Sequence, residues 1–95
     1  MSNFVPILET EIRLNKVFPN PTSGLTCIEI QNNNAFVGSL KLLDIFGRTI
    51  EEIHNGIFQE NSRKYFLDAS HFPSGVYFIV LQEARKKTTI PLLIN

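Results

Sequence analysis

Residues able to carry out acid–base or nucleophilic chemistry are few in this sequence, and they lie far apart. His54 and His71 are the only histidines, and Cys27 is the only cysteine. Acyl transfer needs a nucleophile, a base that is usually histidine, and an orienting acid that converge in space. Neither histidine stands in a Ser, Cys or metal motif, and Cys27 lies in an apolar segment with no neighbouring histidine. We therefore predict that the protein is not an enzyme and interpret Cys27 as a small buried hydrophobic residue.

Acidic residues, glycines and metal ligands give no sign of a bound cofactor. Asp44 and Asp68 each adjoin turn residues, where a carboxylate usually accepts hydrogen bonds from backbone N–H groups. A structural zinc site needs about four ligands, which one cysteine and two scattered histidines do not supply. The glycines stand singly at turns and form no phosphate-binding loop. We expect no cofactor, no metal and no small-molecule substrate.

The charge balance excludes a general electrostatic partner. Nine basic and nine acidic residues give a formal net charge of zero, so no overall field attracts nucleic acid or an anionic membrane. A local excess occurs at Arg85, Lys86 and Lys87. Such residues usually lie at sheet edges, where they discourage aggregation. We expect no nucleic-acid partner, but Lys86 and Lys87 remain candidates for a local contact.

The pattern of turns and apolar segments predicts the frame that would hold these residues. With 95 residues, of which 43% are hydrophobic and 19% charged, the chain fits one folded domain. Polar and turn-forming residues recur at short intervals, as in a sandwich or barrel. The segments between them predict an all-β fold, a seven-stranded antiparallel immunoglobulin-like β-sandwich, with strands at 12–18, 25–30, 39–43, 48–54, 63–68, 76–82 and 87–94.

Segment 76–82 is the most apolar of the seven. A strand of this kind usually lies centrally in its sheet with both faces covered. We expect both faces of this strand to be largely covered, with Val76, Phe78 and Val80 on one side and Tyr77, Ile79 and Leu81 on the other. Segment 48–54 alternates with charged residues and is expected to be half exposed.

Turn chemistry fixes two further features. Asp44 and Gly47 occupy the first and fourth positions of a type I turn, so segments 39–43 and 48–54 should form a hairpin, and Asn55-Gly56 should mark the next turn. Pro91 lacks the N–H group that a strand donates to its neighbour. The last segment therefore belongs at a sheet edge or contains a break.

The start of the chain reads differently from the rest. Residues 1–13 lack clear alternation, and Pro6 interrupts their only apolar cluster, so we interpret them as a linker, followed by a domain over 14–95. The first residues lack the basic region of a signal peptide, and no apolar run approaches the roughly 20 residues of a membrane span. Either the chain is cytosolic, or it is a piece of a longer exported protein.

Three motifs carry a family resemblance. Residues 18–24 (Phe-Pro-Asn-Pro-Thr-Ser-Gly) resemble the Pro-Asn-Pro-x-x-Gly opening of the type A C-terminal sorting domains of the type IX (Por) secretion system of Bacteroidetes. Residues 42–48 resemble the middle motif, an apolar strand followed by Asp-x-x-Gly-Arg, and residues 67–78 resemble the third, Leu-x-x-Gly-x-Tyr. Each motif alone is typical of an ordinary turn, but the three occur in the order and at the spacing of the family.

The resemblance implies a secretion signal, with residues 1–13 as the linker from an upstream cargo domain. The parent protein would pass through the periplasm, be directed across the outer membrane, and reach the cell surface or the medium. Its partners would be the outer-membrane secretion machinery and a sortase-like protease that removes the domain by cutting before Pro19. Turn residues and an open sheet edge are expected to meet the machinery. The recognition candidates are Pro19, Asn20, Pro21, Gly24, Asp44, Gly47, Arg48, Gly75, Tyr77, Lys86 and Lys87.

One alternative belongs to another functional class. An immunoglobulin-like structural or adhesive module of a cell-surface protein would have the same predicted fold. The chain has no Trp and only two Tyr residues, so nothing indicates an aromatic platform for sugars, although loops could still bind a partner. Export of an unrelated passenger distinguishes the two, because only a sorting domain should direct it.

Overall fold

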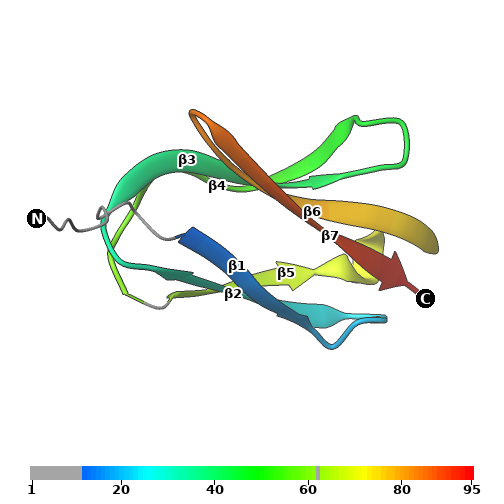
Figure 1. Ribbon diagram of the computed structural model, residues 1–95. Coiled ribbons are helices and arrows are strands. Elements are labelled where there is room, and N and C mark those ends of the chain that lie inside the picture. Colours follow the sequence, from blue (N-terminus) through cyan, green and yellow to red (C-terminus); the bar gives the residue numbers. More distant parts are fainter. Residues whose placement is uncertain (1–11, 62) are drawn as a thin grey trace, which may run out of the picture.

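The computed structural model describes residues 12–61 and 63–95, which form seven strands and one 3-10 turn (Figure 1). The elements are β1 (Ile12–Phe18), β2 (Leu25–Asn32), β3 (Phe36–Leu43), β4 (Thr49–Phe58), β5 (Arg63–Asp68), η1 (Ala69–His71), β6 (Gly75–Glu83) and β7 (Lys86–Ile94). The linker predicted over 1–13 lies outside the described residues except for 12 and 13, which belong to β1.

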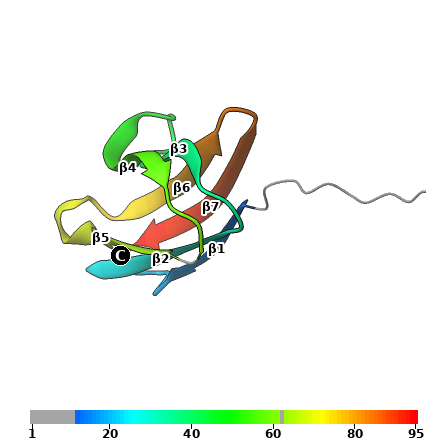
Figure 2. The same ribbon diagram turned by 90° about the vertical axis from the view of Figure 1, so that its left-hand side faces the viewer.

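The strands form two sheets. One sheet has the order β1-β2-β5 and the other the order β4-β3-β6-β7, and every pairing between these strands is antiparallel. Figure 2 shows the sheets as two separate layers facing each other. The all-β prediction, with seven strands in two antiparallel sheets, is therefore confirmed.

The core lies between the sheets and follows the alternation of the strands. Side chains from both layers are fully or almost fully buried there, and burying an aliphatic side chain of this size contributes roughly 1.5–3 kcal/mol. Because alternate residues of a strand point to opposite faces, one face of each sheet supplies the core. Its most buried members are Ile28, Ile30, Leu40, Leu42, Phe58, Leu67, Ile79, Leu92 and Ile94.

Strand β6 confirms one part of its prediction and corrects the other. It lies between β3 and β7, and Tyr77, Ile79 and Leu81 are buried in the core. On its outer face only Val80 is buried, and Val76 is 45% exposed. The expectation that both faces are largely covered is wrong at Val76, because in the described part of the chain no third layer packs over this sheet.

The hairpin of β3 and β4 is longer than predicted. Asn55 and Gly56, expected to form a turn, lie inside β4, which continues to Phe58. Phe58 is fully buried and stacks on Phe36, with 4.6 Å between the ring centroids. Packing of the two rings, which occupy paired positions in the hairpin, outweighs the local turn preference. Segment 48–54, expected to be half exposed, is more exposed than that: residues 48–52 are all exposed and residues 53 and 54 are partly buried, because β4 lies at the edge of its sheet.

The last segment, β7, is an edge strand, as the position of Pro91 predicts. Its pairing with β6 runs without a register shift from Lys86 to Ile94. The Pro91 carbonyl points away from β6, toward Asn20. Because the N–H and C=O of a residue in an antiparallel strand point to the same side, the missing N–H of Pro91 removes no bond to β6.

Phe58 gives a test of the fold at the point where the strand prediction failed. We expect Phe58→Ala to lower the free energy of unfolding by about 3–5 kcal/mol, because it leaves a cavity between the sheets. Phe66→Ala is the matched control, since Phe66 is 59% exposed on the outer face of β5, and its effect should stay within about 0.5 kcal/mol. Urea unfolding followed by circular dichroism measures both. Equal effects of the two substitutions would contradict this packing.

Candidate recognition site

The three sequence motifs lie at one end of the sandwich. This end, called the motif end below, carries the β1–β2 turn (19–24), the β3–β4 turn (44–48) and the connection from β5 to β6 (69–74) (Figure 1). The pairing supports the view in the figure, since Gly75 pairs with Ile94, Leu43 pairs with Phe78, and Thr22 forms a bridge with Ile94. The end of β7 therefore lies among the motifs.

The first motif holds the edge of β7. Asn20 Nδ2 donates a hydrogen bond to the Pro91 carbonyl at 2.8 Å, and the Leu93 N–H donates to Asn20 Oδ1 at 3.0 Å. The Asn20 amide thus bonds to β7 as the backbone of a neighbouring strand would. Pro19 and Pro21, on either side of it, are exposed, and the peptide bonds that precede both prolines are cis.

Thr22 extends this contact to the end of the chain. Its N–H donates to the Leu93 carbonyl at 3.0 Å, and its carbonyl accepts from the Asn95 N–H at 2.8 Å. Gly24 connects the same turn to η1, because its carbonyl accepts a hydrogen bond from the Ala69 N–H at 2.9 Å. The first motif therefore joins β7 and the β5–β6 connection in one network of hydrogen bonds.

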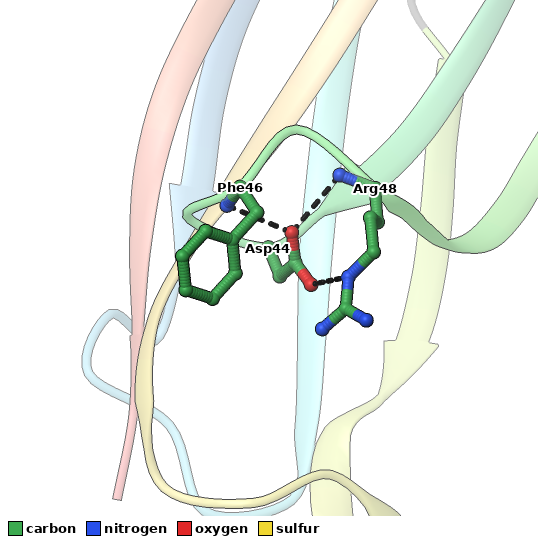
Figure 3. Close-up of polar contacts among 3 residues, drawn as sticks. All are labelled: Asp44, Phe46 and Arg48. Atoms are coloured by element: carbon green, nitrogen blue, oxygen red, sulfur yellow. Dashed lines mark hydrogen bonds and ion pairs between the residues drawn. The ribbon is translucent and has the colours of Figure 1, made fainter.

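The second motif forms the turn that the sequence predicts. The Gly47 N–H donates to the Asp44 carbonyl at 3.0 Å, and Gly47 has the left-handed φ of 84° that glycine adopts without strain. The Asp44 carboxylate accepts from the Phe46 N–H (2.9 Å), the Arg48 N–H (2.9 Å) and Arg48 Nε (2.7 Å), as Figure 3 shows.

These contacts determine the ionisation of Asp44. Burial raises the pKa of its carboxyl group, but the hydrogen bonds from Arg48 and Phe46 lower it, and the result is a pKa below the ordinary value of 3.8. The turn is therefore held by an ionised carboxylate. The capping role predicted for this residue is confirmed. Asp68 acts in the same way at η1, where its carboxylate accepts from the Ser70 N–H at 3.0 Å.

The third motif contributes Gly75 and Tyr77. The Tyr77 ring is buried in the core, and its hydroxyl donates a hydrogen bond to the Pro73 carbonyl at 2.6 Å. Gly75 has a φ of 151°, which residues with a side chain rarely adopt. The two residues thus set the path of the chain as it enters β6, and both act on the frame of the domain.

A hollow of about 300 Å³, open to solvent, lies between the second and third motifs. It brings together four of the predicted candidates, Asp44, Arg48, Gly75 and Tyr77. The sequence analysis missed the apolar residues beside them. We call this feature the turn hollow; besides the four candidates, Ile45, Phe46, Ile50, Pro73, Ser74 and Val76 line it. Ile45 and Phe46, two large apolar residues in the middle of a predicted turn, were the signal that could have revealed it.

The remaining candidates lie elsewhere. Lys86 and Lys87 are exposed at the β6–β7 hairpin, at the opposite end of the sandwich from the motifs (Figure 1). The structure does not bring them together with the other candidates. Pro19, Asn20, Pro21 and Gly24 are at the motif end but do not line the turn hollow. The candidates therefore occupy at least three separate places.

Residues considered for catalysis do not converge in the described part of the chain. Cys27 is buried, as predicted, and Nε2 of His54 bonds to the Ile57 carbonyl at 2.7 Å. Within residues 12–61 and 63–95 no group of three or more His, Cys, Asp or Glu side chains could hold a metal ion. No helix in these ranges has the length and hydropathy to cross a membrane.

A comparison with known protein families decides the identity of the domain. The model of the secretion system C-terminal sorting domain matches residues 16–95, which include all three motifs. The chain belongs to this family. The sorting domain is therefore a C-terminal signal for type IX secretion, the pathway of Bacteroidetes; it interacts with the secretion machinery and directs export to the cell surface or the medium. No curated protein matches the chain.

The Asn20 contact of the sorting domain leads to a stability prediction. We expect Asn20→Ala to lower the free energy of unfolding by about 1–2 kcal/mol, because two hydrogen bonds to β7 are lost. Asn20→Asp should cost at least as much at neutral pH, since a carboxylate cannot donate to the Pro91 carbonyl. Asn33→Ala, in an exposed loop, should change it by less than about 0.5 kcal/mol. Denaturant unfolding would refute this role for Asn20 if the Asn20 and Asn33 variants proved equally stable.

The Asp44 turn predicts a dependence on pH. Because the pKa of folded Asp44 lies below 3.8, the carboxylate contributes fully to stability above that value, and this contribution is lost as the pH falls through the folded pKa. The melting temperature of Asp44→Asn should therefore approach that of the wild type between about pH 6 and about pH 2. An NMR titration of the carboxyl group checks the cause, since Arg48→Gln should raise its midpoint. A midpoint at or above the ordinary value would contradict the assignment.

Proposed function

We propose that the sorting domain acts as a rigid address label that presents its motif end to the outer-membrane machinery and carries out no reaction itself. The observation that carries this proposal is the convergence of all three motifs at one end of the sandwich, around the end of β7. The hydrogen bonds of Asn20, Thr22 and Asp44 hold this end in a defined shape. A surface that is ordered before binding loses less conformational entropy when its partner arrives.

The proposal includes removal of the domain after passage through the periplasm. A sortase-like protease would cut in the linker at residues 1–13, upstream of the sorting domain at 14–95. The burial of Leu14 and Val17 in the core supports a cut ahead of β1. A cut between β1 and Pro19 would detach these two side chains from the chain that forms the rest of the core, whereas a cut in the part of the linker that precedes β1 leaves the sheet intact.

We further propose that the fold is immunoglobulin-like. On the immunoglobulin plan, β1, β2 and β5 correspond to strands A, B and E, and β3, β6 and β7 correspond to C, F and G. Strand β4 pairs with β3 in the place of the C′ strand of variable-type domains. The Tyr77 hydroxyl bonds to the backbone four residues upstream at the start of β6, as the tyrosine of a tyrosine corner does at the start of strand F. The family match favours sorting over the alternative of an adhesive immunoglobulin-like module.

Export of an unrelated passenger tests the function. A fluorescent protein is placed between a signal peptide and the full chain and produced in a bacterium with an active type IX system. We expect the passenger on the cell surface or in the medium, cleaved upstream of β1, and the passenger without the domain should stay in the periplasm. An established sorting domain on the same passenger serves as the positive control. If that control is exported while the folded chain stays in the periplasm, the proposal is wrong.

Lys86 and Lys87 are not part of the surface proposed here. They lie at the β6–β7 hairpin, far along the strands from the motif end. Their role in recognition stays a prediction from the sequence. A Lys86→Gln, Lys87→Gln double variant in the same fusion examines that role separately from the motif end.

A further inference from the structure

We propose that the turn hollow binds an extended peptide segment of the export apparatus in which a large apolar side chain is followed by an acidic one. The inference rests on the proposed function for its partner, but the hollow and its chemistry stand on the structure alone. Three features support it: apolar walls exposed to solvent, one cation at the rim, and a turn that is already ordered.

The walls of the turn hollow expose more apolar surface than the fold requires. Ile45 is 62% exposed, Phe46 77% and Val76 45%, and all three line the same hollow. None of them contributes to the buried core cluster. Contiguous apolar surface of this kind on a small soluble domain usually marks a binding site. At about 300 Å³, the hollow is at the lower limit of ligand pockets, which suits a single side chain of a partner better than a cofactor.

Arg48 supplies the charge at the rim. Its Nε bonds to Asp44 (Figure 3), and its two terminal nitrogens make no hydrogen bond within the described residues. The Arg48 side chain is 73% exposed, and its guanidinium carbon lies 5.6 Å from the centroid of the Phe46 ring. The planar donors of a guanidinium match a carboxylate. An acidic side chain of the partner can therefore bond to Arg48 beside the apolar side chain in the hollow.

Asp44 does not oppose such a partner strongly. Its carboxylate accepts two hydrogen bonds from backbone N–H groups as well as the bond from Arg48. The two N–H groups therefore share with the Arg48 guanidinium in stabilising its negative charge. Arg48 is the one cationic side chain among the lining residues. A phosphate group carries a charge of about −1.5 to −2 and is usually bound by several cations. The single cation favours a carboxylate.

The surroundings limit how the segment can lie. The edge of β4, which starts next to the hollow, carries the exposed acids Glu51 and Glu52, and charged residues at an edge discourage the addition of a strand. They also repel a second acidic residue farther along β4. The segment is therefore expected to bind at the hollow and Arg48, and not along the whole edge of β4.

A binding experiment with the complete chain tests the chemistry. The isotope-labelled protein is titrated with the peptide Ac-Gly-Phe-Glu-Gly-NH2 and followed by NMR. We expect saturable shifts at the amides of Ile45, Phe46, Arg48 and Val76. The peptides Ac-Gly-Phe-Gln-Gly-NH2 and Ac-Gly-Ala-Glu-Gly-NH2 should each bind at least about fivefold more weakly, because one lacks the carboxylate and the other the ring.

Three results of the titration would overturn the proposal. If the Phe-Gln peptide binds as tightly as the Phe-Glu peptide, Arg48 does not recognise a carboxylate. If the shifts are confined to amides on another face of the domain, the peptide does not bind in the turn hollow. Concentration-dependent shifts at the same amides without peptide, together with dimers in sedimentation, mean that a second copy of the chain occupies the hollow instead.

Export of the passenger fusion tests the partner with a matched pair of variants. Ile45→Ser changes the hollow, and Ile57→Ser changes an equally exposed isoleucine at the other end of the hairpin, with exposures of 62% and 58%. We expect Ile45→Ser to reduce export at least about tenfold, a loss of roughly 1.4 kcal/mol of binding free energy, while Ile57→Ser exports normally. Both should melt like the wild type.

The two levels of the proposal fail in different ways. If the wild-type fusion is exported and Ile45→Ser is exported equally well, the hollow does not meet the machinery, although the domain is a signal. If the wild-type fusion is not exported but the Phe-Glu peptide binds as expected, the proposed function is wrong and the binding site is correct. The titration thus decides the chemistry of the hollow whatever the outcome of the export assay.

Discussion

The edge of β7 is closed by a turn that lies more than seventy residues earlier in the chain. The Asn20 side chain occupies the hydrogen-bonding groups of Pro91 and Leu93, and Thr22 continues the contact to Asn95. Without these bonds, β7 would present an unpaired edge over its last residues, where Leu92 and Ile94 fill the core. The first and last segments of the domain thus depend on each other, and the motif end exists because they meet there.

The residues at the motif end are of two kinds: some hold the fold together, and others are exposed to a partner. Asn20, Asp44, Gly75 and Tyr77 use their polar groups or their backbone conformation within the domain. Ile45, Phe46 and Arg48 are exposed on the turn that Asp44 holds. The residues that carry the family resemblance are therefore mainly those of the frame. A motif of this kind identifies the family by its geometry, and most of the chemistry offered to a partner comes from side chains between the motif positions.

The parts that sequence reasoning predicted correctly are those determined locally. Alternation gave the seven strands, the Asp44 and Gly47 positions gave the turn, and the missing N–H of Pro91 placed β7 at an edge. The parts it missed depend on distant contacts. Stacking of Phe58 on Phe36 extends β4 through Asn55-Gly56. The exposure of Val76 depends on whether another layer packs on the outer face of its sheet, and the local sequence pattern does not predict this. The partners of Asn20 lie 71 and 73 residues away.

The difference between residues of the frame and exposed residues affects how a loss of export is interpreted when a motif residue is substituted. Substituting Asn20 or Tyr77 acts first on the edge of β7 or on the start of β6, so a loss of export at these positions reports on the frame unless stability is measured as well. Ile45 and Phe46 are exposed and make little contribution to the core, so their substitution leaves the frame intact. Differences between sorting domains at such display positions can change affinity for the machinery without changing the fold. The turn between β3 and β4 is thus the place where a common frame can carry different contact surfaces.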